Sequence, residues 1–209
     1  MHGDGIMSEP TTVRAEFERI GLDEMNFTDR YKIFTGAVIP RPIAFVSSLN
    51  EDGTVNGAPF SSFMIASVEA GYLAFSVGPS AAEEKETLRN VRRSEEFVIN
   101  MVSENLAEQV QLCGDPHPQK TQKLELAGLR LVPSERIKTP RIADSNIQFE
   151  CRLHIILRFG DSHMVVGEVV LMHAKVGLVR NGKIDPLEYA ALGRIAGRNY
   201  CTVRDIISV

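Results

Sequence analysis

One stretch, from Ala37 to Phe63, limits what this 209-residue chain can fold into more than any other. It holds an apolar run from Ile43 to Val46, which continues through Ser47 and Ser48 to Leu49. The turn-forming residues Asn50 to Gly53 follow, and a second extended run begins at Val55. Asparagine, aspartate and glycine between two extended runs have the composition of a β-turn. The stretch therefore predicts a β-hairpin.

Polar residues and prolines flank this hairpin. Arg41 stands between Pro40 and Pro42 before the first strand, and Ser61 and Ser62 follow the second. Proline fixes its own φ and biases the residue before it toward extended geometry, so the backbone at Arg41 is stiff. Because arginine binds phosphates and carboxylates through two parallel hydrogen bonds, the hairpin is expected to form a rigid ledge for a flat anionic ligand.

Turn signals divide the rest of the chain into further strands. The sequences Gly160 to Ser162 and Asn181-Gly182 are typical of turns between paired strands. The expected strands are Met64 to Val68, Tyr72 to Gly78, Glu96 to Val102, Ile147 to Phe159 and His163 to Val179. Many strands with hairpin-like spacing predict an antiparallel β-barrel rather than alternating βαβ units. Without a GxGxxG or Walker sequence, a Rossmann or P-loop nucleotide site is disfavoured.

The two long strands carry position-specific expectations. Cys151, Leu153, Ile155 and Leu157 alternate and are expected on one face of the first. Gly167 lies in the middle of the second, where an isolated glycine marks either a β-bulge or a close ligand.

Helices are expected to be few and short. They are placed at Val13 to Ile20, after Ser80, after Ser103 and at Lys123 to Gly128. Ser80 with Glu83 fits a capping box for the second of these. The aromatic-rich segment from Met25 to Phe34 shows no clean period and is expected to lie across the barrel mouth or against a partner subunit.

The helix after Ser80 holds a candidate phosphate site. Leu88 and Val91 form its apolar stripe, and Lys85, Thr87 and Asn90 lie largely off that stripe. An ammonium, a hydroxyl and an amide near the start of a helix suit a phosphate group. By spacing alone, a solvated helix face explains the same residues.

Charge and cysteine content limit the binding partners and the cellular compartment expected for the protein. The net charge of −4 argues against a nucleic-acid or anionic-membrane partner, because both favour a basic surface. No apolar run approaches the roughly 20 residues of a membrane helix. Three cysteines without CxxC spacing suit a reducing, cytoplasmic location.

Cys113 and His117 form the one local pair that suggests other chemistry. They could be two ligands of a metal ion, or they could be a thiol nucleophile and its general base. No second ligand pair has suitable spacing, so a buried cysteine beside a loop histidine is favoured and no metal is expected. His163 opens a strand without a local carboxylate to orient it, so no catalytic side chain is predicted.

An ordered series of short motifs resembles the flavin reductase-like family of FMN-binding split barrels. The likeness extends over about residues 30 to 200. It rests on Arg41-Pro42-Ile43-Ala44, Asp52-Gly53, Asn56-Gly57-Ala58-Pro59-Phe60-Ser61, Lys85-Glu86-Thr87-Leu88-Arg89-Asn90, Phe97-Val98-Ile99-Asn100 and Gly193-Arg194.

This resemblance implies a fold and a ligand. The fold would be a mainly β, antiparallel Greek-key split barrel over residues 25–209, after an extension of residues 1–24. The protein would be a homodimer that binds FMN at the subunit boundary. The implied flavin and ribityl contacts are Arg41, Pro42, Ser47, Ala58, Pro59, Phe60, Ser61, Ser62 and Phe63. The implied phosphate contacts are Lys85, Thr87 and Asn90. Arg194 and Tyr200 would lie near the flavin, although an irregular tail packed on the barrel explains them equally.

The implied activity is hydride transfer from NAD(P)H to flavin. The cofactor carries that chemistry, so no acid or base side chain is required. An oxygenase or other redox protein would be a partner. Two other readings stay open, an FMN-containing electron carrier for protein partners and a non-catalytic barrel that binds another cofactor.

Overall fold

The computed structural model describes residues 17–80, 84–118 and 121–209. Its main element is an antiparallel seven-stranded sheet with the order β3-β2-β6-β9-β10-β5-β4. The strands are β2 (Ala44–Leu49), β3 (Val55–Phe60), β4 (Phe63–Ser67), β5 (Tyr72–Val77), β6 (Glu96–Met101), β9 (Ile147–Phe159) and β10 (Ser162–Ala174). The predicted mainly β fold and the predicted hairpin, which is β2–β3, are confirmed.

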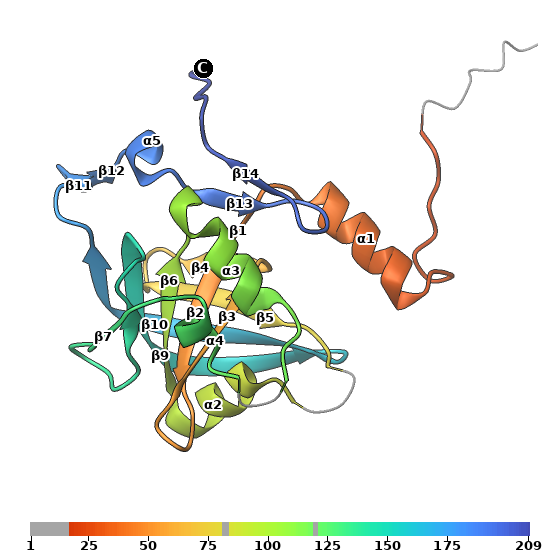
Figure 1. The fold of residues 1–209 in the computed structure, drawn as a ribbon. Helices are drawn as coiled ribbons and strands as arrows, with labels where there is room; N and C mark the ends of the chain where they lie inside the picture. The colour runs from red at the N-terminus through yellow and green to blue at the C-terminus, as the bar shows by residue number, and fades with distance from the viewer. Residues whose placement is uncertain (1–16, 81–83, 119–120) are drawn as a thin grey trace, which may run out of the picture.

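The sheet curls so that its two edge strands come together at one corner. The edge strands β3 and β4 are consecutive in the chain, with Ser61 and Ser62 alone between them. The backbone N–H of Ser76 in β5 donates to the carbonyl of Ser62 at 2.8 Å, which extends the β4–β5 pairing into this corner. The result is a half-barrel, seen in Figure 1 with the long β9 and β10 ribbons passing behind β2 and β3.

Three smaller sheets and several short helices surround the half-barrel. The small sheets join β1 (Arg41–Pro42), β13 (Leu192–Arg194) and β14 (Tyr200–Thr202); β7 (Leu131–Val132) and β8 (Arg141–Ile142); and β11 (Val179–Arg180) and β12 (Lys183–Ile184). The helices are α1 (Phe27–Ala37), α2 (Glu86–Ser94), a 3-10 turn (Glu104–Leu106), α3 (Ala107–Gly114), α4 (Lys123–Leu126) and α5 (Pro186–Tyr189).

Strand β2 is buried on both faces, which explains the consecutive apolar residues Ala44 to Val46. One face meets the barrel interior, where the Phe75 ring lies 5.0 Å from Phe60 and 5.4 Å from Phe97 between centroids. The other face, through Phe45, meets a second cluster that includes Val110 of α3. Strand β2 is therefore held between two hydrophobic cores.

The segment expected to lie as an arm forms helix α1 instead. Asn26 caps it, since its side-chain oxygen accepts from the Asp29 N–H at 2.9 Å. Its aromatics Phe27, Tyr31 and Phe34 are spaced by four and three residues, a helical period that the prediction missed. No residue of α1 is buried, and the helix projects from the barrel in Figure 1 rather than crossing its mouth.

The side chains of the long strand β9 change from one face of the sheet to the other at a β-bulge. Val166 pairs with Ile155 and Gly167 pairs with Leu153, so His154 is the extra residue. Leu153 therefore packs on the barrel core with Cys151, whereas Ile155 points to the outer face and is 44% exposed. The predicted single face is wrong because one inserted residue inverts the alternation that follows.

Gly167 lies at this bulge, so the first of its two predicted roles, a β-bulge rather than a close ligand, is confirmed. A Cβ atom there would come within 2.4 Å of the Phe97 ring, so the close neighbour is a core aromatic. Strand β10 ends at Ala174, earlier than the predicted Val179, and Gly177 then turns the chain with φ +86°.

Two predicted helix starts need correction. Helix α2 begins at Glu86 with Lys85 at its N-cap, so Ser80 does not cap it. Residues 13–16 of the predicted first helix lie outside the described residues, and Phe17 to Ile20 are not helical. The predicted helix at Lys123 is confirmed as α4. The strand turn at Asn181-Gly182 is also confirmed, with both residues at positive φ.

Candidate functional site

Arg41 lies at the corner where the sheet edges meet, but its guanidinium is directed into the protein. It donates to the carbonyls of Thr35 at 2.6 Å, Val38 at 2.9 Å and Ile195 at 3.2 Å, and to the Ser61 hydroxyl at 3.3 Å. The residue is 8% exposed, and burial lowers the pKa of its guanidinium, as does the nearby charge of Arg194. Arg41 therefore joins α1, the β3–β4 corner and the C-terminal segment.

The other residues of the predicted flavin site differ in how far their side chains are exposed to solvent. Pro42 and Ser62 are exposed, and Ala58, Pro59, Ser61 and Phe63 are half-buried, so each presents atoms at the surface of the corner. Phe60 turns its ring into the core against Phe75. Ser47 is fully buried and its hydroxyl donates to the Pro140 carbonyl at 2.7 Å.

The predicted phosphate residues lie just before α2 or within it, and this helix packs against the β2–β3 hairpin. Lys85 is the N-cap residue and its side chain is exposed. Thr87 and Asn90, expected off the buried stripe, are only 2% and 6% exposed. They face the hairpin because Asn56 donates to the Thr87 hydroxyl at 2.9 Å and Asn90 donates to Asn50 at 2.7 Å. These hydrogen bonds fix the start of α2 against β3.

The C-terminal segment forms part of the same corner. Gly193 and Arg194 lie in β13 and pair with Pro42 and Arg41 of β1, which establishes the register of this segment. The Arg194 guanidinium lies 4.6 Å above the Tyr200 ring centroid and also donates to the Tyr200 hydroxyl. The alternative of an irregular tail is wrong, because these residues pair as strands.

Helix α3 anchors this C-terminal segment from its other side. The Gln111 side-chain oxygen accepts from the Tyr200 hydroxyl at 2.9 Å and from Arg194 at 3.3 Å. Arg198 makes a two-point ion pair with Asp115 at 2.7 and 3.1 Å. That contact lowers the pKa of the Asp115 carboxyl.

Cys113 and His117 do not form a reactive pair. The Cys113 thiol is 2% exposed and donates to the Lys123 carbonyl at 3.5 Å, and burial raises its pKa to about 11. His117 Nε2 lies 2.8 Å from the Leu112 carbonyl. A nucleophilic thiol needs a lowered pKa, so the thiol–base interpretation is wrong. Among the residues that the structure describes, no group of three metal-binding side chains gathers.

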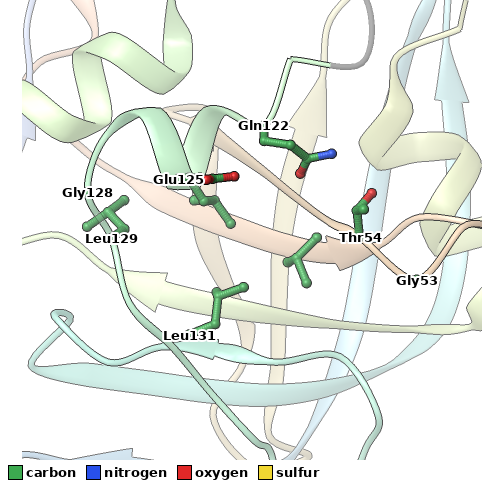
Figure 2. Close-up of a pocket in the computed structure, with 9 residues that line it drawn as sticks. Gly53, Thr54, Gln122, Glu125, Gly128, Leu129 and Leu131 are labelled. Atoms are coloured by element: carbon green, nitrogen blue, oxygen red, sulfur yellow. The ribbon is translucent and has the colours of Figure 1, made fainter.

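An open groove lies beside α4, away from the predicted flavin residues. Its apolar floor is formed by Val55, Leu124, Leu129 and Leu131. Figure 2 shows Gln122 and Glu125 on one rim and Thr54 of the hairpin turn on the other. The groove and the barrel corner lie on different parts of β3.

Three contributors to the site were absent from the prediction. Asn56 and Gln111 act through side-chain hydrogen bonds to residues distant in sequence. Lys123 lies close enough to Lys85 for its charge to lower the pKa of the Lys85 ammonium, after desolvation as the main cause. The packing of α4 on β3 brings Lys123 there, and no local motif marks it. Along the described segments, no helix has the length and apolar character needed to cross a membrane.

Comparison with known proteins identifies the family of this chain. A family model described as a flavin reductase like domain matches residues 35–194. An uncharacterized protein of Aquifex aeolicus is 36% identical over 172 residues, which cover 81% of this chain and 88% of the relative.

Solved structures give the same result. Nitrilotriacetate monooxygenase component B from Bacillus cereus has a TM-score of 0.87 and 31% identity, with 92% of this chain and 98% of that chain covered. The 2-nitrobenzoate 2-nitroreductase NbaA of Pseudomonas fluorescens has a TM-score of 0.83 and 35% identity, with 92% and 95% covered. A protein with a split barrel domain from Shewanella frigidimarina has a TM-score of 0.80 at 15% identity, over 90% and 94% of the two chains, which shows the fold alone. The chain therefore belongs to the flavin reductase-like family and has its split-barrel fold.

Proposed function

We propose that this protein binds FMN and transfers hydride from NAD(P)H to the flavin. One structural observation carries the proposal: strand β3 runs from the start of α2, where Lys85 is exposed, to the polar corner of the barrel at Ser61. Asn56 of β3 contacts the start of α2, where Lys85 is exposed, and Ser61 follows β3 at the barrel corner. At ~3.3 Å per residue these two points are about 16 Å apart. FMN has the matching chemistry, a phosphate at one end and a flat polar ring at the other.

The described residues fit this ligand. Lys85 forms no ion pair with any carboxylate of the described chain, and it lies at the positive end of α2. In the proposed site, Lys85 would hold the phosphate while Thr87 and Asn90 fix the helix that carries it. Ser61, Ser62 and the neighbouring backbone would meet the ring.

Arg41 and the C-terminal segment have a supporting part in this proposal. The hydrogen bonds of Arg41 keep the corner in place, and Arg194 with Tyr200 would form its far wall. The bound flavin would supply the redox chemistry by taking hydride at N5 from nicotinamide C4. The protein supplies binding, orientation and exclusion of water.

The active form is proposed to be a homodimer. Met64, Ala74, Val166 and Ile155 are cross-strand neighbours in one row across β4, β5, β10 and β9. Met64 is 52% and Ile155 44% exposed, and the row lies on the outer face of the sheet. An apolar row whose two ends, Met64 and Ile155, are exposed suits burial against a second copy, whose residues would complete the flavin site.

The acceptor of the reduced flavin's electrons is proposed from the relatives. The Bacillus cereus neighbour is a monooxygenase component, so an oxygenase is the first candidate partner. The 35% identity to NbaA favours a second candidate, direct reduction of a nitroaromatic acid. Oxidation of NADH or NADPH that depends on added 2-nitrobenzoate would identify this second activity.

The first experiment is the visible spectrum of the purified protein, with chromatography of the small molecule that heat releases. Flavin absorption bands and released FMN are expected. Stopped-flow mixing with NADH and NADPH should then bleach the flavin band. A protein that holds FMN but is not reduced by either nucleotide is an electron carrier. A protein that binds neither FMN nor FAD nor riboflavin when these are added refutes the proposal.

A further inference from the structure

We propose that helix α1 of one copy of this chain packs on the outer face of the barrel of a second copy, and that Tyr31 of this helix donates a hydrogen bond to the flavin bound there. The inference rests on the flavin-binding function and the homodimer proposed above, and it adds to them the element that joins the two copies. It is carried by two apolar surfaces that lie apart within one chain.

The first surface is the aromatic face of α1, formed by Phe27, Tyr31 and Phe34. These residues are spaced by four and three positions, so their side chains share one side of the helix. They are 64%, 58% and 51% exposed, and none of the eleven residues of α1 is buried within the described chain. A helix of this length gains most of its stability from packing an apolar side on another surface. The aromatic face therefore lacks the surface that would stabilise it.

The attachment of α1 keeps this face away from its own barrel. The Arg41 guanidinium donates to the carbonyls of Thr35 at 2.6 Å and Val38 at 2.9 Å, which fixes the end of the helix at the barrel corner. From there the helix projects outward from the barrel (Figure 1). The aromatic face is thus held where a second molecule can reach it.

The second surface lies on the outer face of the barrel. Met64 is 52%, Ile155 is 44% and Leu157 is 40% exposed, and we call these three residues the outer patch. Met64 and Ile155 are the two ends of one row of cross-strand neighbours. Leu157 follows Ile155 by two positions in β9, so it lies on the same face of the sheet. The outer patch therefore spans the sheet from β4 to β9.

The outer patch adjoins the flavin corner. Leu157 pairs with Met164 of β10, and Met164 pairs with Ser76 of β5. The Ser76 N–H donates to the Ser62 carbonyl at 2.8 Å, so this row of cross-strand neighbours ends at Ser62. Met64 follows Ser62 by two positions in the chain. A helix that covers the outer patch therefore lies beside the residues proposed to meet the flavin ring.

The areas of the two surfaces favour α1 on the outer patch over contact between two α1 helices. An aromatic side chain has about 150–250 Å² of surface, so three that are more than half exposed bury about 350 Å² when they are covered. Two helices packed on each other would bury only that area on each copy, whereas a stable interface buries about 800 Å² on each. Two-fold symmetry lets each copy contribute both its helix and its outer patch, which brings the buried area to about 700 Å² per copy.

Tyr31 carries the polar group of the aromatic face and lies at its centre. Its ring lies 6.1 Å from the Phe27 ring between centroids, and its hydroxyl makes no hydrogen bond within the described residues. The edge of a flavin ring carries carbonyl oxygens and nitrogens that accept hydrogen bonds. In the proposed dimer the Tyr31 hydroxyl donates to this edge from the second copy, so two chains hold each flavin.

Light scattering of the full-length protein tests the docking of α1. Wild type should have twice the 23.1 kDa chain mass. Phe34→Asp should raise the dimer dissociation constant at least about a hundredfold, because each dimer would bury two added charges. Gly36→Asp is the matched control and should remain a dimer, since it adds the same charge on the opposite side of α1, where nothing lies within 4 Å of a Cβ atom.

Mixing two variants tests whether Tyr31 acts across the interface. Tyr31→Phe keeps the ring for docking but loses the hydroxyl, and Lys85→Gln loses the proposed phosphate contact. Each variant alone should weaken FMN binding about tenfold. In a mixed dimer, the barrel of the Tyr31→Phe chain keeps Lys85 and receives an intact Tyr31 from the other chain. After subunit exchange in an equal mixture, about a quarter of the sites should therefore bind FMN with wild-type affinity.

The outcomes separate this inference from the proposed function. A monomeric wild type, a Phe34→Asp dimer as stable as wild type, or a Gly36→Asp control that dissociates equally would overturn the docking of α1. A mixture without wild-type sites, or unchanged FMN affinity in Tyr31→Phe, would overturn the role of Tyr31. If wild type binds FMN in any of these cases, the proposed function stands. If wild type dimerises through α1 but binds no flavin, the proposed function fails, and the role of Tyr31 fails with it.

Discussion

Arg41 and Arg194 are direct partners across the antiparallel pair of β1 and β13. Two like charges placed opposite each other are unfavourable, and each guanidinium is compensated locally. Arg41 donates to three backbone carbonyls, while Arg194 is placed over the Tyr200 ring and bonded to Gln111. The pair therefore joins the entry of the hairpin to the C-terminal segment.

Replacing Arg41 by lysine should destabilise the protein by about 1–3 kcal/mol. Lysine keeps the charge but cannot make the forked set of hydrogen bonds, so buried carbonyls lose their donors. Urea unfolding of the flavin-free protein measures this. Arg180→Lys is the control, because Arg180 makes an exposed ion pair with Glu188 at 2.9 Å. Unchanged stability with weakened FMN binding would show Arg41 to be a direct ligand instead.

Gly167 and Gly36 provide a matched pair of glycine-to-alanine changes. Gly167→Ala should cost about 1–3 kcal/mol, since its Cβ would meet the Phe97 ring at 2.4 Å and Cys151 Cβ at 3.2 Å. Gly36→Ala in helix α1 should stabilise by up to about 1 kcal/mol, because nothing lies within 4 Å and alanine favours helix. Denaturant unfolding distinguishes the two. Similar effects at both sites would contradict the tight packing at the bulge.

The buried carboxylate of Glu150 should make stability depend on acidic pH. Burial raises the pKa of Glu150, but hydrogen bonds from the N–H groups of Glu135 and Arg136 and from His173 outweigh it, so the pKa is lowered overall. A carboxyl with a lowered folded-state pKa contributes stability above its unfolded value of about 4.3. That contribution is lost as the pH falls through the folded-state pKa.

The measurement compares wild type with Glu150→Gln by urea unfolding from pH 7 to pH 3. At pH 7 the variant should be less stable by roughly 2 kcal/mol or more, because charge-assisted hydrogen bonds are lost. The difference should shrink below about pH 4.3 as the wild-type carboxyl protonates. If the difference in unfolding free energy stays constant over this range, the variant is destabilised by altered packing and not by the loss of the carboxylate charge.

An aspartate in the outer apolar row should dissociate the proposed dimer. Ile155→Asp places a charge at the exposed β9 end of that row, which is costly to bury against a partner. Light scattering should give twice the 23.1 kDa chain mass for wild type and a single chain mass for the variant. Val176→Asp, at a fully exposed loop position, should remain a dimer. A monomeric wild type would refute the homodimer.

Local sequence was sufficient for the hairpin and most strand limits. Asn50 to Gly53 can form little other than a turn, and apolar runs such as that of β2 have to be buried. The spacing of Phe27, Tyr31 and Phe34 by four and three residues also indicates helix α1 from sequence alone. The order of motifs was enough to predict the family and its fold.

The tertiary structure alone decided the contacts of the candidate site. A one-residue bulge at His154 inverted the faces of β9, and periodicity cannot locate such an insertion in advance. The sequence predicts Arg41 as a ligand-binding residue, yet the fold surrounds its donors with carbonyls of α1 and the C-terminal segment and with the Ser61 hydroxyl. Helix α4 packs on β3 because Leu124 lies directly on Gly57, and no local motif marks that contact. Hydrogen bonds and charges act over a few ångströms of space, and only the packed chain determines which distant residues lie that close.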